Sequence, residues 1–440
     1  MANSLLEAYK KRLNISESVY SRAHNGDKMD TNRKLVVAKC LQNLNNFMNE
    51  SFDGSMATQR QDLGLYKKFC LNLTTVALPN LVAHDLVIVH PMSSMSGYVA
   101  YLQYSTGTEK GDIESNTFLR DPFKQGEAIP SYTSSTVVDP ITSVADDMVP
   151  TWGPVVKGAF TDTDGAAKDV KIVSPEGVVT YADLNAEGKV PKASLVENGK
   201  VAYLYDNIII PQDKLPTIKA EMKSIPLIAK ARRLAIYFSQ IAAFQAKTDY
   251  GFDLGDSLAE QAVGELQYEV DTEIINLLDE TAGDAQATLT WSRTLPVGVS
   301  KTEHYEGFSE VVEIARAIIY NRTKKFAPNY MIIAADVLPV LTFIKGWSAA
   351  PAGQVNGPYM AGTLNSLKVF VSPSMASGEY LIGVNGNDML SSVAVYAPYM
   401  AILPTSLLQF ADGTTSQGFS TLYDLKVLNK DLIVKGKVVA

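Results

Sequence analysis

Apolar residues recur at helical spacing in the N-terminal part of the chain. Val37, Leu41, Leu44 and Met48 stand four, three and four residues apart, and Thr31 can cap a helix that contains them. A single helix of this length cannot hold a hydrophobic core alone, so we expect its apolar stripe to pack on another surface. Two further helices are predicted, at Ser4–Leu13 and at about Gln61–Leu78, where Pro79 ends the second.

From Leu86 onwards the pattern changes to short alternating runs separated by turns. Tyr98–Tyr104 alternates and is rich in aromatic and β-branched residues, which predicts a strand. A polar stretch rich in Gly, Ser and Thr follows, from Ser105 to Pro150. The other strand candidates are Leu86–Val89, Val155–Val156, Val170–Val173, Gly177–Tyr181 and Val201–Ile210. We interpret those after residue 152 as a β-rich insertion, at about 152–206, within a long excursion of the chain.

The clearest helix pattern in the chain covers residues 255–280, after a strand-like run over 216–245. Seven apolar residues follow one another at steps of four: Leu254, Leu258, Ala262, Leu266, Val270, Ile274 and Leu278. We expect this stripe to pack on a sheet. Acidic residues are expected on the opposite, solvated face: Glu260, Glu265, Glu269, Asp271, Glu273, Asp279 and Glu280.

The last third of the chain alternates between helix and strand patterns. Val311–Phe326 reads as a helix, and Asp336 can cap another helix that stops at Gly346. A loop rich in Gly, Ala and Pro is expected over Gly346–Gly362. The predicted strands are Tyr330–Ala334, Leu367–Val371, Tyr380–Val384, Val393–Tyr396 and Phe419–Val439. We expect an overall fold of the α+β class.

Composition narrows the classes of function. The 440 residues carry a formal net charge of −8, which argues against a protein whose main task is to grip nucleic acid. Residues 1–80 differ, with 11 Lys and Arg against 7 acidic residues. Neither an apolar run long enough for a membrane span nor a secretory signal is visible, and the two cysteines, Cys40 and Cys70, suit a reducing cytoplasm.

The sequence contains no recognisable catalytic or metal-binding motif. Its four histidines are scattered, and His84 and His90 have no third ligand at a credible spacing. Gly107–Gly111 lacks the full pattern of a phosphate-binding loop, and there is no Gly-x-Ser-x-Gly motif. The acids of the long helix lack a Glu-x-x-His partner. We therefore expect no enzymatic activity, no metal and no cofactor.

Several segments, taken in order, resemble the major capsid proteins of T4-type tailed bacteriophages. The entry segment Ala77–Gly97 combines a helix stopped by Pro79-Asn80-Leu81, an apolar strand, Pro91-Met92 and a closing glycine. The other matching segments are Ile228–Ser239, Gln240–Gly251, the 255–280 helix, Asn329–Asp336, Gly362–Val371 and Val395–Ala401. The first 60 residues align with nothing in the family; because the chain starts at Met1, we expect them to form an ordered, uncleaved arm.

The resemblance implies an HK97-type capsid fold with five parts. These are a helical N-terminal arm (1–80), an entry strand and extended loop with the insertion (81–215), a peripheral domain with the spine helix (216–304), an axial domain (305–420) and a C-terminal strand that returns to the core (421–440). It implies a virion protein, made in the bacterial host cytoplasm, that self-assembles into the icosahedral shell around double-stranded DNA.

The implied partners are further copies of the chain in hexamers and pentamers, together with portal, scaffolding and decoration or vertex proteins. Packaged DNA would lie nearby without specific contacts, and no membrane is involved. Alternatives are a pentameric vertex protein of the same fold, an encapsulin-type shell protein or an enzyme. The candidate inter-subunit contacts are Lys230, Arg232 and Arg233, paired with acids such as Glu265 and Glu269.

Overall fold

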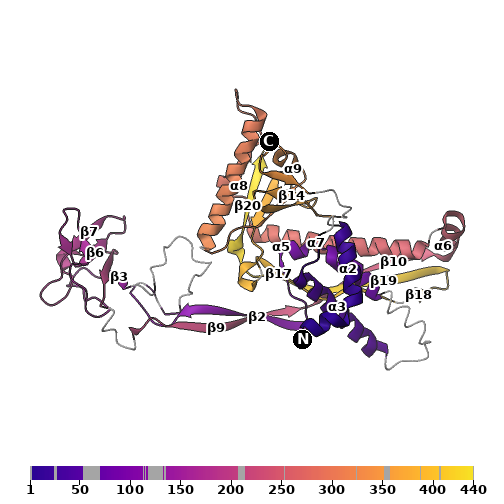
Figure 1. Cartoon of the computed structure of the whole chain (residues 1–440), viewed down its shortest axis with the longest axis horizontal. Coiled ribbons are helices and arrows are strands. Elements are labelled where there is room, and N and C mark those ends of the chain that lie inside the picture. Colours follow the sequence, from indigo (N-terminus) through magenta and orange to yellow (C-terminus); the bar gives the residue numbers. More distant parts are fainter. Residues whose placement is uncertain are drawn as a thin grey trace. The chain divides into compact units, whose positions relative to one another are not determined.

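In the computed structural model the chain folds into two compact units (Figure 1). We call Met1–Val99 with Ser224–Ala440 the body, and Ala100–Lys223 the insert. The structure describes residues 2–23, 27–52, 70–111, 113, 115–116, 132, 135–206, 214–251, 253–323, 325–350, 357–386, 388–405 and 408–439. The body and the insert each have hydrophobic clusters of their own, so each is described by itself.

The body begins with helices that pack onto its main core. They are α1 (Ala2–Ala8), α2 (Lys10–Ala23) and α3 (Thr31–Phe52). The predicted helix is confirmed, although Thr31 is its first residue and not its cap. Its stripe of Val37, Leu41, Leu44 and Met48 is buried in the same cluster as the sheet residues Tyr396 and Met400. The stripe therefore finds its partner within its own chain.

The predicted helix Ser4–Leu13 is divided between α1 and α2, and only part of the predicted 61–78 helix lies in the described residues. Residues 70–77 are helical, and a 3₁₀ turn, η1 (Leu78–Asn80), carries the proline expected to end the helix. The prediction of a strand from Leu86 was partly wrong. Leu86 ends a short helix, α5 (Ala83–Leu86), and the strand is only β1 (Ile88–Val89).

A five-stranded sheet forms one half of the body. Its order is β1–β17–β19–β10, with β18 also paired to β19; β1 and β17 are parallel and the other pairs antiparallel. Its strands are β10 (Lys230–Ser239), β17 (Ala394–Pro404), β18 (Leu408–Gln409) and β19 (Thr414–Val427). The long helix α7 (Leu254–Ala282) packs on this sheet. A short helix, α6 (Gln240–Gln245), and a π-helical turn, η5 (Ala246–Tyr250), join β10 to α7.

A seven-stranded sheet forms the other half of the body, in the order β11–β20–β16–β12–β15–β14–β13. Helix α8 (Lys301–Thr323) packs along it (Figure 1). Phe308 and Ile319 of this helix are fully buried. The strands are β11 (Thr290–Ser292), β12 (Tyr330–Ala334), β13 (Trp347–Ala349), β14 (Tyr359–Leu364), β15 (Leu367–Ser372), β16 (Glu379–Gly383) and β20 (Ile433–Val439).

Three sequence predictions in this half were wrong in detail. Asp336 does not cap α9 (Leu338–Leu341), because its carboxylate accepts hydrogen bonds from Ser377 Oγ and the Gly378 amide. The expected 346–362 loop contains β13 and the start of β14. The expected strand 419–439 is two strands, because a 3₁₀ turn, η8 (Lys430–Leu432), separates β19 from β20 and the two join different sheets.

The chain leaves the body along β2 (Ser96–Thr106) and returns along β9 (Ile218–Ile228), which pair as a two-stranded ribbon (Figure 1). The insert holds a four-stranded sheet, β3–β8–β6–β7, and a hairpin of β4 and β5. Their bounds are β3 (Thr136–Pro140), β4 (Phe160–Thr161), β5 (Ala167–Lys168), β6 (Val170–Val173), β7 (Val179–Ala182) and β8 (Lys200–Leu204).

The predictions for the strands of the insert were only partly confirmed. The prediction for Val170–Val173 is confirmed, whereas Val155 forms only an isolated bridge, to Tyr205. The expected strand from Val201 ends at Leu204, and residues 207–210 lie outside the described part of the chain. The sheet also contains β3, which precedes the expected start of the insertion.

Candidate functional site

The predicted basic patch lies on β10, the edge strand of the five-stranded sheet next to α7. Side chains alternate along a strand, so Arg232 shares a face with the half-buried Leu234 and Ile236, which pack against α7 and its neighbours. Arg233 points to the opposite face. Two adjacent arginines are thereby given different surroundings.

Arg232 is held inside its own chain. Its guanidinium forms an ion pair with Glu273 of α7, and its Nε donates a hydrogen bond to Tyr423 Oη over 3.4 Å. The Tyr423 hydroxyl in turn donates to the Glu273 carboxylate. The hydrogen bond to Tyr423 and the neighbouring carboxylate raise the pKa of Arg232 above its usual range. Sequence reasoning did not pair these three residues, because they come from three separate elements.

The other four candidates are exposed on the body. Lys230 and Arg233 lie on β10, and Glu265 and Glu269 lie on α7. None of the four forms an ion pair with another residue that the structure describes. Glu269 also lines a hollow of about 460 Å³ along α7. The structure therefore keeps these four charges available on the surface of the subunit.

Asp271 was wrongly predicted to lie on the solvated face of the long helix. Its side chain is buried, and Oδ1 accepts hydrogen bonds from the backbone N–H groups of Val82 (3.1 Å) and Ala83 (3.3 Å). Burial raises the pKa of Asp271 to about 7, although the two N–H donors oppose this shift. The carboxylate thus ties the entry segment to α7. The buried side of α7 includes more residues than the predicted stripe of apolar residues spaced four apart. Asp271, which directly follows Val270, lies on this wider buried side.

The two strands of the ribbon carry alternating patterns whose apolar side is uncovered. On β2, Tyr98, Leu102 and Tyr104 share one face and are 72%, 48% and 52% exposed. On β9, Ile218 and Met222 are 61% and 74% exposed, and the residues between them are charged or small. The sequence already contained this alternation, although only the structure shows that its apolar side is left in solvent.

The described residues contain no group of three or more His, Cys, Asp or Glu side chains that could hold a metal ion. Cys40 is buried, and burial raises the pKa of its thiol to about 12, so it stays protonated. Burial also lowers the pKa of His84 to about 3, which keeps the ring neutral. No helix in the described part of the chain is long and apolar enough to cross a membrane.

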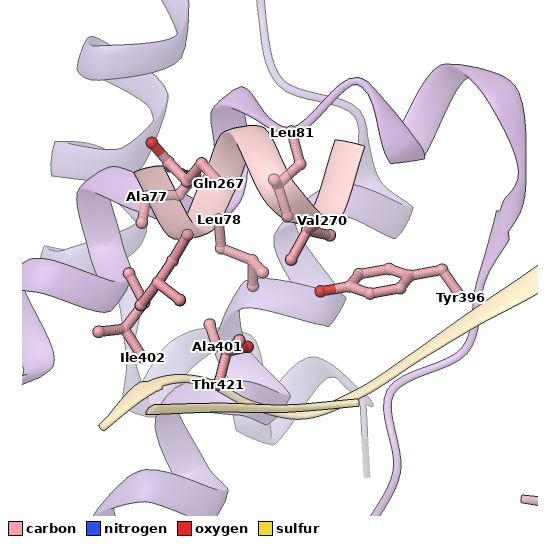
Figure 2. A pocket seen from close by; sticks show the side chains of 10 residues that line it. Ala77, Leu78, Leu81, Gln267, Val270, Tyr396, Ala401, Ile402 and Thr421 are labelled. Atoms are coloured by element: carbon pink, nitrogen blue, oxygen red, sulfur yellow. Dashed lines mark hydrogen bonds between the residues drawn. The ribbon is translucent and has the colours of Figure 1, made fainter. Parts of the chain in front are cut away.

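A small cavity lies between α7 and the five-stranded sheet. Its volume is about 20 Å³, which is room for about one water molecule. Figure 2 shows the Tyr396 hydroxyl pointing into the space between Val270 of α7 and the sheet residues Ala401 and Thr421. A cavity of this size is a packing feature of the core.

The fold is an α+β subunit that leaves an amphipathic ribbon and the charged side chains of Lys230, Arg233, Glu265 and Glu269 exposed. The chain belongs to the Gp23 major capsid protein family, because the family model matches residues 64–438. It is similar to the major capsid protein of Enterobacteria phage T4, with 22% identity over 391 residues that cover 80% of this chain and 73% of the relative. The major capsid protein of Vibrio phage KVP40 is 22% identical over 392 residues, with coverage of 80% and 74%.

Solved structures give partial superpositions. A chain from Microbacterium phage Oxtober96 superposes with a TM-score of 0.40 and 12% identity, over 82% of this chain and 91% of that one. A chain of the SrpI encapsulin complex from Synechococcus elongatus PCC 7942 superposes with a TM-score of 0.33 and 10% identity, over 51% and 79%. The family assignment rests on the match of sequence to family.

The protein is therefore a major capsid protein of a tailed phage and a component of the virion shell, which many copies of the chain build together. The expectation that it is a structural protein and not an enzyme is confirmed by the family. The matched segment starts at residue 64, so α1, α2 and α3 precede it.

Proposed function

We propose that the subunit has the HK97-type division of labour and that its ribbon is the part that clasps a neighbouring subunit. In this proposal α7 is the spine helix of a peripheral domain built on the five-stranded sheet. The seven-stranded sheet with α8 forms the axial domain, β2 and β9 form the extended loop, and the rest of the insert is carried on that loop. The N-terminal helices serve as a layer on the body.

The observation that carries this proposal is the exposed apolar side of the ribbon. A two-stranded ribbon is marginally stable in water, and alternating apolar residues stabilise it only when that face is covered. Tyr98, Leu102 and Met222 are each about half exposed or more within the single chain. A neighbouring copy would supply the missing cover, and closed symmetry would repeat the contact around the shell.

Charge pairs between copies form the second part of the proposal. Lys230 and Arg233 would meet Glu265 and Glu269 of neighbouring subunits, whereas Arg232 contributes mainly through its internal pair with Glu273. An exposed ion pair contributes only about 0 to 1 kcal/mol, but a shell repeats each pair in every subunit. These contacts would fix how neighbouring subunits are aligned, because only the correct alignment brings unlike charges together and keeps like charges apart.

The proposed assembly consists of hexamers and pentamers of this chain around double-stranded DNA. Portal, scaffolding and decoration or vertex proteins complete the list of proposed partners. Because the net charge is −8, the DNA would be enclosed without strong adhesion to the wall. Synthesis in the bacterial host cytoplasm belongs to the same proposal.

The test compares two faces of β9. Met222→Asn removes an apolar side chain from the uncovered face, and Glu221→Asn changes a residue of the opposite face. Met222→Asn is expected to lower the yield of closed particles, measured by electron microscopy and sedimentation, while the isolated subunit keeps its circular dichroism spectrum. Glu221→Asn is expected to assemble like the wild type. Equal yields from the two variants would contradict the clasping role of the ribbon.

A charge reversal tests the second part. Arg233→Glu is expected to make the yield of assembled particles depend more strongly on salt concentration. The stability of the isolated subunit should not change. Arg232→Glu serves as the contrasting variant, because it breaks the pair with Glu273 and should destabilise the isolated subunit. Normal assembly of Arg233→Glu over a wide range of salt concentrations would show that Arg233 is not part of the interface.

A further inference from the structure

The small cavity between α7 and the five-stranded sheet belongs to the packing of the core, yet it is not lined by apolar groups alone. Ten residues line it, and nine of them are buried: Ala77, Leu78, Leu81, Leu266, Val270, Tyr396, Ala401, Ile402 and Thr421. The tenth, Gln267 of α7, is half-buried, and its Nε2 donates a hydrogen bond to the Ala77 carbonyl. The space therefore lies within the core, and the groups that face it decide what it can hold.

The Tyr396 hydroxyl is the polar group that points into this space (Figure 2). Tyr396 is 1% exposed, and none of the residues that the structure describes forms a hydrogen bond with its hydroxyl. Burial raises the pKa of Tyr396 well above its usual range, so the hydroxyl stays protonated and can donate. A buried hydroxyl without a partner costs free energy, and in native cores such a group is paired with protein or with ordered water.

Two neighbouring hydroxyl groups already have partners. The rings of Tyr396 and Tyr423 lie 5.4 Å apart between centroids, but the Tyr423 hydroxyl accepts a hydrogen bond from Arg232 and donates one to Glu273. Thr421 lines the cavity too, and its Oγ1 donates to a backbone carbonyl of β17 over 3.4 Å. A hydroxyl has one proton and two lone pairs, so Thr421 can still accept a hydrogen bond.

The size and chemistry of the cavity identify its ligand as water. The volume is about 20 Å³, above the roughly 10 to 15 Å³ that a cavity needs to hold one water molecule. The ten lining residues include no carboxylate, imidazole or thiol that would favour a cation. A water molecule can accept from Tyr396 and donate to Thr421, which gives it the two polar partners that a buried water requires.

We propose that this cavity is a binding site for one ordered water molecule, which bridges Tyr396 of β17 to Thr421 of β19 beside Val270 of α7. The water is then a structural part of the joint between the long helix and the sheet. The site lies in the core of a single subunit, so this inference stands or falls independently of the proposed shell-building contacts.

Counting the buried water molecules tests the proposal directly. Magnetic relaxation dispersion of water ¹⁷O nuclei reports the number of long-lived water molecules inside the unassembled subunit. Tyr396→Phe removes the hydroxyl and is expected to lower this number by one. Tyr399→Phe is the matched control, because Tyr399 lies on the same strand, is half-buried and does not line the cavity. An unchanged number in Tyr396→Phe would overturn the proposal.

A substitution that fills the cavity gives a second test. Ala401→Val adds two methyl groups at the cavity wall, so it should displace the water and leave the Tyr396 hydroxyl unpaired. The urea midpoint of unfolding should therefore fall, and it should fall much less when Ala401→Val is combined with Tyr396→Phe. A rise in both backgrounds would show that the space is dry, and an equal fall in both would show that the effect is independent of the hydroxyl; either result contradicts the proposal.

A density map of the wild-type protein gives a test that requires no variant to fold. At a resolution that shows ordered water, a peak is expected within hydrogen-bonding distance of both Tyr396 Oη and Thr421 Oγ1. A map that shows water molecules elsewhere in the core but no peak at this position would overturn the proposal.

Discussion

Asn43 links the N-terminal helices to the body, and its replacement tests whether α3 is an integral layer of the subunit. The side chain is only 5% exposed. Its Nδ2 donates hydrogen bonds to the carbonyl oxygens of Met92 (2.7 Å) and Tyr399 (2.9 Å), which belong to the entry segment and to β17. One amide thus joins three parts of the chain that are far apart in sequence.

Asn43→Leu is expected to destabilise the isolated subunit by about 2 to 6 kcal/mol. The change leaves two buried carbonyl groups without a donor, and each unsatisfied group costs about 1 to 3 kcal/mol. Leucine has the same number of side-chain heavy atoms and a similar branched shape, but its methyl groups are larger, so overpacking would add to the loss. Urea unfolding of the unassembled subunit measures the loss, and hydrogen exchange of the α3 amides shows whether the helix is released.

The matched control is Asn46→Leu, because Asn46 lies on the same helix and is exposed. Both variants make the same change in helix propensity, so their difference reports the buried contacts. If the two variants had the same unfolding midpoint, α3 would not be packed on the body in the free subunit. The N-terminal segment would then be an arm that gains its partner only in the shell.

Three further predictions concern the core of the body. Leu266→Ala, at a position 2% exposed against the sheet, should cost about 2 to 5 kcal/mol in urea unfolding, and a loss below 1 kcal/mol would show that the stripe of α7 is not packed. The pKa of Asp271 is raised above its ordinary value of 3.8 to about 7, so its contribution to stability is fully present below about pH 4 and is lost as the pH rises through 7. The free energy of unfolding of Asp271→Asn, relative to that of the wild type, should therefore rise by roughly 1.4 kcal/mol for each pH unit between about pH 4 and pH 7. Identical pH profiles of stability for the two proteins would refute the raised pKa. Gly436→Ala should lower the melting temperature of the subunit, because a Cβ there would lie 2.2 Å from the ring of Tyr380; an unchanged melting temperature would show that the ring can move.

The sequence determined the elements whose signal is local. The steps of four from Leu254 to Leu278 predicted α7, since a helix repeats every 3.6 residues and must bury one side. The run Tyr330–Ala334 predicted β12 with correct bounds, because an uninterrupted apolar run is typical of a strand buried on both faces. The ordered segments from Ala77 to Ala401 also indicated the family, which the match to residues 64–438 shows.

The tertiary structure alone decided which partners the polar residues find. Asp271 reads as one more acid on a charged helix, but the fold brings the amides of Val82 and Ala83 to it. Arg232 and Arg233 are adjacent and identical in chemistry, yet the strand turns only Arg232 towards Glu273 of α7. Periodicity assigns residues to a buried or exposed side, but it carries no information about which distant group lies opposite.

The same limit explains the N-terminal helices and the C-terminal strand. The stripe of Leu41 and Leu44 showed that α3 needs a partner, but the choice between its own chain and a neighbour depended on contacts more than 300 residues away, such as that from Asn43 to Tyr399. The residues from Phe419 to Val439 read as one strand in the sequence. A short turn at Lys430–Leu432 moves the chain from one sheet to the other. Local pattern predicted the longest helices and several strands of this capsid protein, whereas their pairing depended on long-range packing, which the hydrophobic pattern of a single sequence does not specify.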